Sequence, residues 1–154
     1  MPTLIEIADA LADSLDAVSW TTFAGPVTTT RVKWATTPFT PEEMAGGTIA
    51  VAATGIEATR IGRTAHQHDK QLAVFVARAV ESDAEADDMS DWAEEIAEKI
   101  EEHDWSTYAP SVTWPAGVTS PQDVTVTINP DDGLSERNVW RAVIAVSYRV
   151  PRGH

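Results

Sequence analysis

The stretch from Lys70 to Asp104 constrains the fold more than any other part of the chain, because its hydrophobic pattern changes period. From Lys70 to Val80, apolar side chains occupy both faces of an extended backbone, which predicts a central strand covered on both sides. Further on, apolar residues recur every three or four positions, at Met89, Trp92, Ile96 and Ile100. This spacing, with carboxylates in between, predicts an amphipathic helix from Asp88 to Glu102 after an acidic connector.

The residues at the start of the chain predict a helix and then a strand. Thr3 and Glu6 have the spacing of a capping box, so we expect a helix from Leu4 to Leu15 or slightly beyond. The Thr-rich segment Val27 to Trp34 is typical of a half-exposed strand.

The segment before the central strand predicts a second strand and a polar connection. Pro41, after a capping Thr40, indicates one helical turn, and Thr48 to Thr54 alternates like a strand. We interpret the polar segment Gly55 to Asp69 as a long hairpin connection with strand character at Ala58 to Arg63.

Beyond the acidic helix, the chain predicts a loop and two further strands. Trp105 to Pro121 contains three prolines, so we expect a loop with at most a short strand at Ser111 to Trp114. Alternating patterns predict strands at Asp123 to Asn129 and Asn138 to Val150, joined by the turn sequence NPDDG.

Together these elements predict one α+β domain spanning residues 1–154. We expect two layers: a mixed or antiparallel sheet of about four to six strands, packed by the N-terminal helix and the central acidic helix. The chain has no long apolar run and no basic N-terminal signal, so we expect a soluble, unexported protein without a membrane partner. Without cysteine, thiolate metal sites and disulfides are excluded.

The net charge of −13 argues against a protein that grips nucleic acid through its phosphates. Half of the 24 Asp and Glu residues lie between Glu81 and Asp104. Such a run is typical of a solvated helix face. It also fits an acidic surface that faces a basic partner, or DNA that must pass without sticking.

The sequence offers no motif for catalysis, a cofactor or a metal, and we expect none of the three. The motifs of nucleophile elbows, phosphate loops, dinucleotide sites and zinc proteases are all missing. His66 and His68, beside Asp69, lack a third ligand at a diagnostic spacing, so a polar hairpin tip is the better interpretation. Protruding hairpins often make contacts, which makes four residues candidates for an interface: Arg60, Arg63, His66 and His68.

The order of segments resembles that of the tail terminator, or tail-completion, proteins of tailed bacteriophages, similar to the lambda-type terminator. The resemblance covers nearly the whole chain and rests on IEIADALADSL, a strand ending in RVKW, and TPEEM. It continues through TIAVAAT, an Arg-bearing hairpin, KQLAVFVARAV, DWAEEIAEKIEE and the terminal VWRAVIAVSYRV. The resemblance is one of pattern, and the acid density around the second helix departs from it.

This resemblance implies a structural virion protein in the tail or neck, assembled in the host cytoplasm. Its subunits would form a ring, commonly a hexamer, on the tail tube protein, stop tube growth and offer a surface to the head connector or stopper protein. DNA would pass through the hole without sequence-specific binding. The alternatives are another phage neck, stopper or minor tail protein, or a non-viral acidic adaptor that binds a basic partner through the helix at Asp88 to Glu102.

Overall fold

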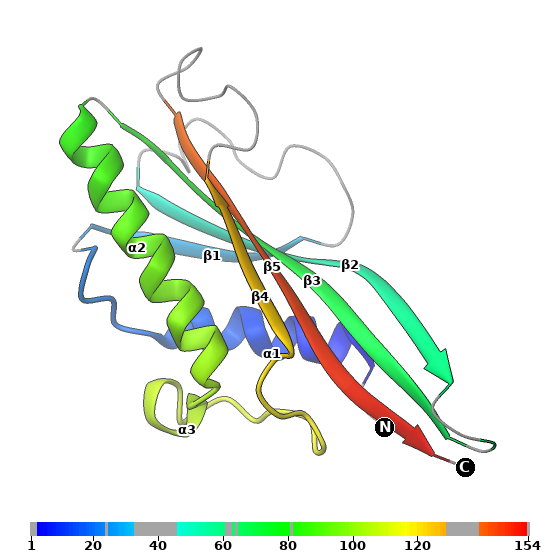
Figure 1. The fold of residues 1–154 in the computed structure, drawn as a ribbon. Helices are drawn as coiled ribbons and strands as arrows, with labels where there is room; N and C mark the ends of the chain where they lie inside the picture. Colours follow the sequence, from blue (N-terminus) through cyan, green and yellow to red (C-terminus); the bar gives the residue numbers. More distant parts are fainter. Residues whose placement is uncertain are drawn as a thin grey trace.

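The computed structural model describes residues 3–23, 25–32, 46–60, 63, 65–80, 82–128 and 139–153. Its elements follow in this order: α1 (Leu4–Ala17), β1 (Val27–Val32), β2 (Gly47–Arg60), β3 (Ala65–Ala79), α2 (Asp83–Glu102), α3 (Trp105–Tyr108), β4 (Asp123–Ile128) and β5 (Val139–Gly153). The five strands form one sheet in the order β1-β2-β3-β5-β4, in which β1 runs parallel to β2 and the other pairs are antiparallel (Figure 1). The expected α+β fold with a mixed sheet is confirmed.

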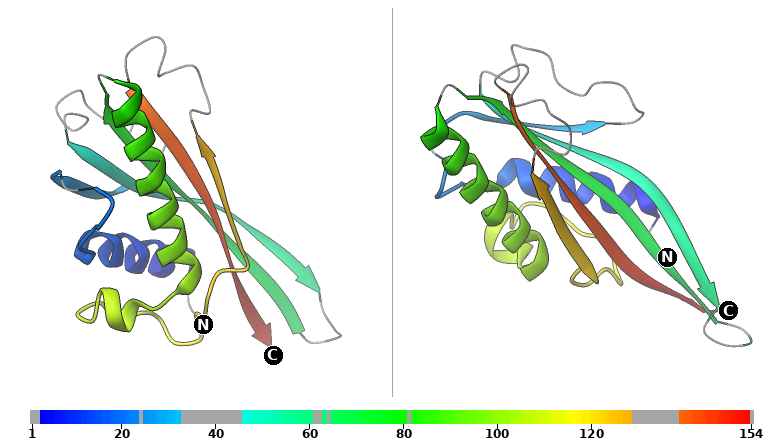
Figure 2. Two further views of the ribbon diagram at one scale, coloured as in Figure 1. Left: turned by 60° about the vertical axis from the view of Figure 1, so that its left-hand side comes forward. Right: turned by 45° about the horizontal axis from the view of Figure 1, so that its top comes forward.

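The helices lie on one face of the sheet, and the hydrophobic core fills the space between the two layers (Figure 2). The strands contribute alternate residues to this core, among them Val51 of β2, Val74 of β3 and Ile144 of β5. The helices contribute the apolar stripes that their sequence period predicts, with Leu11 of α1 and Trp92 of α2 fully buried. These two layers hold β3 at the centre of the sheet, as its sequence predicts.

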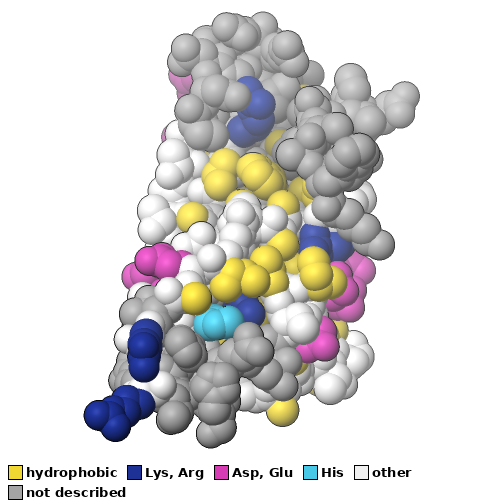
Figure 3. Space-filling model, turned by 90° about the vertical axis from the view of Figure 1, so that its right-hand side faces the viewer, with side chains coloured by type: hydrophobic (Ala, Val, Ile, Leu, Met, Phe, Trp, Pro, Cys, Tyr) yellow, Lys and Arg dark blue, Asp and Glu magenta, His cyan; other side chains and the backbone are white. Residues whose placement is uncertain are grey.

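No described helix or strand covers the other face of the sheet. On that face of β3, Ala73 and Ala77 are buried and Phe75 is half-buried, but the expected cover on this second side comes from no described helix or strand. Figure 3, which views the side away from α2, shows hydrophobic side chains in an irregular band with charged side chains and a His beside it.

The first helix begins as the capping pattern predicts. Thr3 Oγ1 accepts a hydrogen bond from the backbone N–H of Glu6, and the Glu6 carboxylate accepts one from the backbone N–H of Thr3, over 3.1 and 3.2 Å. The two donors at the helix N-terminus are thus satisfied reciprocally. The helix then continues to Ala17, slightly past Leu15.

The acidic helix is longer than its hydrophobic period predicts, so the expected acidic connector is largely wrong. Helix α2 begins at Asp83, where Ser82 Oγ accepts a hydrogen bond from the backbone N–H of Glu85 over 3.2 Å. Carboxylates in the first turn also favour a helix start, because they interact with the positive end of the helix dipole. The acidic residues expected in a connector therefore form the first turns of the helix.

The segment after α2 is a loop as expected, without a strand at Ser111 to Trp114, and it contains a short helix, α3, that the sequence did not predict. The loop nevertheless contributes to the core, because Trp105 is buried. The expected turn at Thr40 and Pro41, the ends of the predicted strands at Trp34 and Asn129, and the turn after Asn129 lie outside the described residues.

A buried carboxylate fixes α2 against the segment that follows α1. Glu95 is 7 % exposed, and its oxygens accept hydrogen bonds from the backbone N–H and the hydroxyl groups of Thr21 and Thr22, over 2.5–3.2 Å. Burial raises the pKa of the Glu95 carboxyl, but the hydrogen bonds from Thr22 and Thr21 outweigh burial and hold the pKa below its ordinary value. This carboxylate is therefore a structural clamp that orients α2.

An aromatic cluster fixes the C-terminal end of α2. His103 ends the helix in a left-handed conformation, with φ of 53°, and its Nδ1 accepts a hydrogen bond from Trp105 Nε1 over 3.1 Å. The ring of Trp114 lies 4.6 Å from that of His103, and Trp114 Nε1 donates to Ser14 Oγ of α1 over 2.9 Å. Burial lowers the pKa of His103, which favours the neutral ring that Nδ1 needs in order to accept.

Candidate subunit interface

A three-stranded arm projects from the two-layer body, and we define it as residues 55–71 and 147–153. Within it β3 pairs with β2 from Gln71 to His66 and with β5 from Gln71 to Ala65. Seven residues of β3 lie in the arm, so at about 3.3 Å per residue it extends roughly 20 Å. Figure 1 and Figure 2 show it pointing away from the helices.

Both outer edges of the arm have no partner strand in the part of the chain that the structure describes. Pairing of β1 with β2 ends at Ala52, and pairing of β4 with β5 ends at Ser147. A register shift between Ala53 and Gly55 marks the root of the arm on β2, and such bulges bend a strand and increase its twist. Open edges of this kind can pair with, or lie against, another chain.

The expected long connection from Gly55 to Asp69 is wrong in its extent, because most of it is regular strand. Strand β2 continues to Arg60 and β3 begins at Ala65. The segment is polar and lacks a hydrophobic alternation, yet β5 supplies a pairing partner along the whole of its β3 part. Partner strands from distant sequence decide such a conformation more than local propensity does.

The structure places all four predicted interface residues in the arm. Arg60 and Arg63 are exposed at its end, where Arg60 Nη2 donates a hydrogen bond to the backbone oxygen of Arg63 over 3.2 Å. His66 lies opposite Arg60 in the register of β2 and β3. His68 is half-buried and lies two residues closer to the body. Their role in an interface stays a prediction.

The last strand adds two cations to the arm that sequence reasoning missed. Arg152 lies opposite His66 in the register of β3 and β5, and Arg149 lies opposite Asp69. Arg149 Nε is 3.2 Å from Asp69 Oδ1, an ion pair across the two strands. The alternating pattern of the last strand predicted a strand up to Val150, but nothing in it revealed the pairing register.

The arm differs in charge from the rest of the chain. It carries five of the 11 Lys and Arg residues and only two of the 24 Asp and Glu residues, for a net charge of +3 against −16 for the remainder. Figure 3 shows Lys and Arg side chains standing out at the lower end of the view, where the arm ends. The arm is therefore a basic projection on an acidic protein.

Acidic side chains gather on the outward face of α2. Five exposed carboxylates recur at alternating spacings of four and three residues along it, and we name them the acidic stripe: Asp87, Asp91, Glu94, Glu98 and Glu101. The opposite face of the helix is buried in the core through Met89, Trp92 and Ile96. The clamp at Glu95 and the cluster at His103 thus hold the acidic stripe outward.

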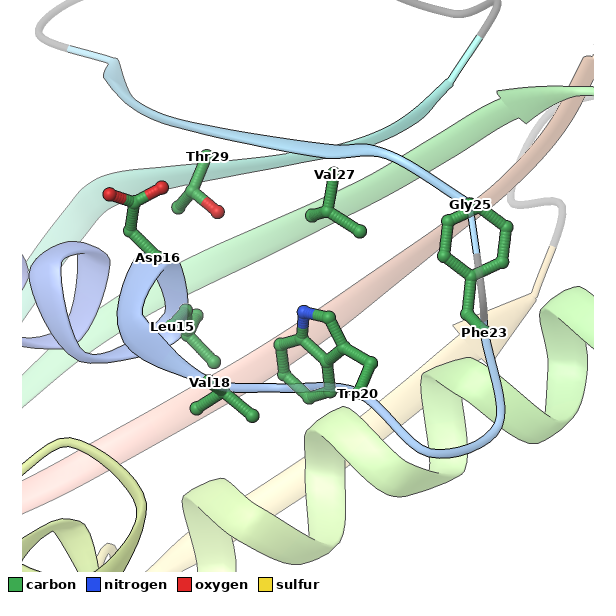
Figure 4. A pocket seen from close by; sticks show the side chains of 8 residues that line it. All are labelled: Leu15, Asp16, Val18, Trp20, Phe23, Gly25, Val27 and Thr29. Carbon is green, nitrogen blue, oxygen red and sulfur yellow. The ribbon is translucent and has the colours of Figure 1, made fainter.

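A pocket of about 320 Å³ lies between the end of α1, the following segment and β1 (Figure 4). Its wall includes Trp20 and Phe23, whose rings lie 6.0 and 4.6 Å from that of Trp92. Among the described residues that line it, Asp16 is the one titratable group. A lone carboxylate in a mixed pocket provides no acid–base pair, so the pocket carries no recognisable chemistry.

Within the described residues, no three His, Asp or Glu side chains lie close enough to hold a metal ion. No described helix is long and apolar enough to cross a membrane.

Comparison of the chain with protein-family models, and with curated protein sequences, found no match.

Proposed function

We propose that this chain is a structural subunit of a tailed bacteriophage that forms a ring at the head-proximal end of the tail. The ring, commonly a hexamer in the group that the sequence resembles, stops growth of the tail tube and joins the tail to the head connector. DNA passes through its hole without sequence-specific binding. The protein acts by assembly and performs no catalysis.

The arm is the observation that carries this proposal. Its two outer edges have no partner strand in the described residues, and it extends roughly 20 Å beyond the body at the rise of a β-strand. A projecting element that contacts a different surface on an identical neighbour makes a heterologous interface. Contacts of this kind close into a ring when the rotation between neighbours allows it.

Two further features support the proposal. The order of the elements, a helix, a strand, a long hairpin, an acidic helix and a final strand, is the order on which the resemblance rests. The net charge of −13 also suits a channel that a polyanion must traverse, because repulsion keeps DNA from adhering to the wall.

The acidic stripe favours a second candidate, an adaptor that binds a basic partner. Five carboxylates on one exposed helix face offer such a partner a continuous negative surface. Oligomeric state separates the two candidates, because the adaptor remains a monomer or dimer. A neck, stopper or minor tail protein of the same phage class shares the ring and differs in its neighbours.

Light scattering of the purified protein across a range of concentrations tests the proposal. A ring subunit reaches one discrete mass and then stops growing, since a closed ring has no unsatisfied interface. A protein that stays monomeric or dimeric throughout contradicts it. So does one whose mass continues to rise with concentration, because open chains do not close.

A further inference from the structure

We propose that the basic end of the arm docks on the acidic stripe of α2 in a second copy of this chain. The inference rests on the proposed ring, because it identifies the contact that joins neighbouring subunits.

Cationic residues gather at the end of the arm. Arg60, His66 and Arg152 lie at one level of β2, β3 and β5, and Arg63 follows in the connection. Arg60 and Arg63 are exposed there, and the arm as a whole carries a net charge of +3. The two carboxylates of the arm, Glu57 and Asp69, share a level three residues nearer the body, where Asp69 already pairs with Arg149. This end of the arm therefore attracts an anionic surface.

The acidic stripe concentrates charge of the opposite sign. Its members follow one another at i, i+3 and i, i+4, where like charges destabilise a helix by about 0.2–0.5 kcal/mol per pair. The one cation of α2, Lys99, lies 3.6 Å from Glu95 and 4.0 Å from the centre of the Tyr108 ring. Since its ammonium group is engaged there, the stripe gains from a cationic surface supplied by another chain.

The basic end of the arm and the acidic stripe lie apart within one chain. Figure 1 and Figure 2 show α2 and the end of the arm on opposite sides of the body. The stripe from Asp87 to Glu101 is about 21 Å long at 1.5 Å per residue, close to the length of the arm. The arm also carries Ile56, which is 52 % exposed and adds apolar area to a contact. A second copy thus matches the arm in charge and in length.

Nucleic acid fits the basic end less well than a second copy does. Phosphate binding requires several clustered cations, and the remainder of the chain carries a net charge of −16 that repels a duplex.

Charge reversal on each surface tests the contact. The arm variant R60E/R63E and the stripe variant E94K/E98K are each expected to dissociate at least tenfold more readily than the wild type in sedimentation velocity. Mixing the two variants restores association, because an acidic arm then meets a basic stripe and a native arm meets a native stripe. This rescue also shows that both variants are folded.

Matched controls separate the effect of losing this contact from the effect of changing the net charge of the protein. D13K/D16K makes the same charge change as the stripe variant on exposed residues of α1, and R60K/R63K keeps the charge of the arm; both should associate like the wild type. Raising the salt from about 50 to 500 mM should weaken wild-type association, since the contact is electrostatic and exposed.

The outcomes distinguish a failure of this contact from a failure of the proposed function. If the arm and stripe variants form the wild-type ring, or their mixture stays dissociated, the contact is wrong although the ring stands. If the mixture associates but only into open chains, the contact is correct and the proposed function fails. Arm variants that lose affinity for a DNA duplex but keep wild-type self-association also overturn the contact.

Discussion

Replacing Glu95 by glutamine tests how α2 is held in place. The change preserves the shape of the side chain but removes its charge and turns one acceptor oxygen into a donor. In the wild type, four donor groups of Thr21 and Thr22 point at the carboxylate. A glutamine side chain at this position would satisfy only those donors that face its remaining oxygen.

The expected loss in the free energy of unfolding follows from the donors that Glu95→Gln leaves without an acceptor. Both Thr residues are exposed, so their hydroxyl groups can turn to water, whereas the two backbone N–H groups are fixed. A hydrogen bond to a charged group contributes about 1.5–3 kcal/mol, and losing roughly one such bond with the charge lowers the free energy of unfolding by about 2 kcal/mol. Glu98→Gln, nearly one turn further along α2 and exposed, is the control and should change it by less than about 0.5 kcal/mol.

Urea unfolding followed by tryptophan fluorescence measures both effects, and pH adds a second test. Because the folded pKa of Glu95 lies below its ordinary value of 4.5, the stabilisation is complete above that pH and is lost as the pH falls through the folded pKa. The difference between wild type and Glu95→Gln should therefore shrink in acid. A variant as stable as Glu98→Gln at neutral pH, or a difference that does not change with pH, would refute the clamp.

Three further substitutions test the core. Val76→Asp places a charge in the central strand, where Val76 is fully buried, and should abolish cooperative unfolding; a cooperative transition would contradict its placement. Gly47→Ala brings a Cβ within 2.7 Å of the Phe23 ring and 2.8 Å of the Trp92 ring. The overpacking should lower the free energy of unfolding by about 1–3 kcal/mol in urea titrations. An unchanged free energy of unfolding would rule out this contact. Trp114→Phe removes the donor to Ser14 and should lower it by about 1–2 kcal/mol, whereas an unchanged midpoint would show that the bond contributes nothing.

The sequence predicts the elements that carry their own pattern. The capping box of Thr3 and Glu6, the two-sided apolar strand of β3 and the period of α2 each depend on residues close in sequence. Local sterics and burial determine such elements, so pattern alone is sufficient to locate them.

The sequence did not predict the arm, because strands that are distant in sequence pair to form it. Its polar strands are ordered by pairing with β5, and the level at which Arg60, His66 and Arg152 meet depends on a register that no local pattern specifies. The role of Glu95 was equally hidden, since its partners lie 73 and 74 residues earlier and it looks like one of many acids in α2. Periodicity shows which face of a helix is buried but not which carboxylate is clamped there.

The central claim is that identical subunits assemble head to tail into a closed ring. Electron microscopy of the negatively stained protein at low salt, on the largest species in solution, tests this claim most directly. The account predicts uniform rings with a central hole, and their absence from R60E/R63E samples. Fields that contain only single particles or open chains would contradict it.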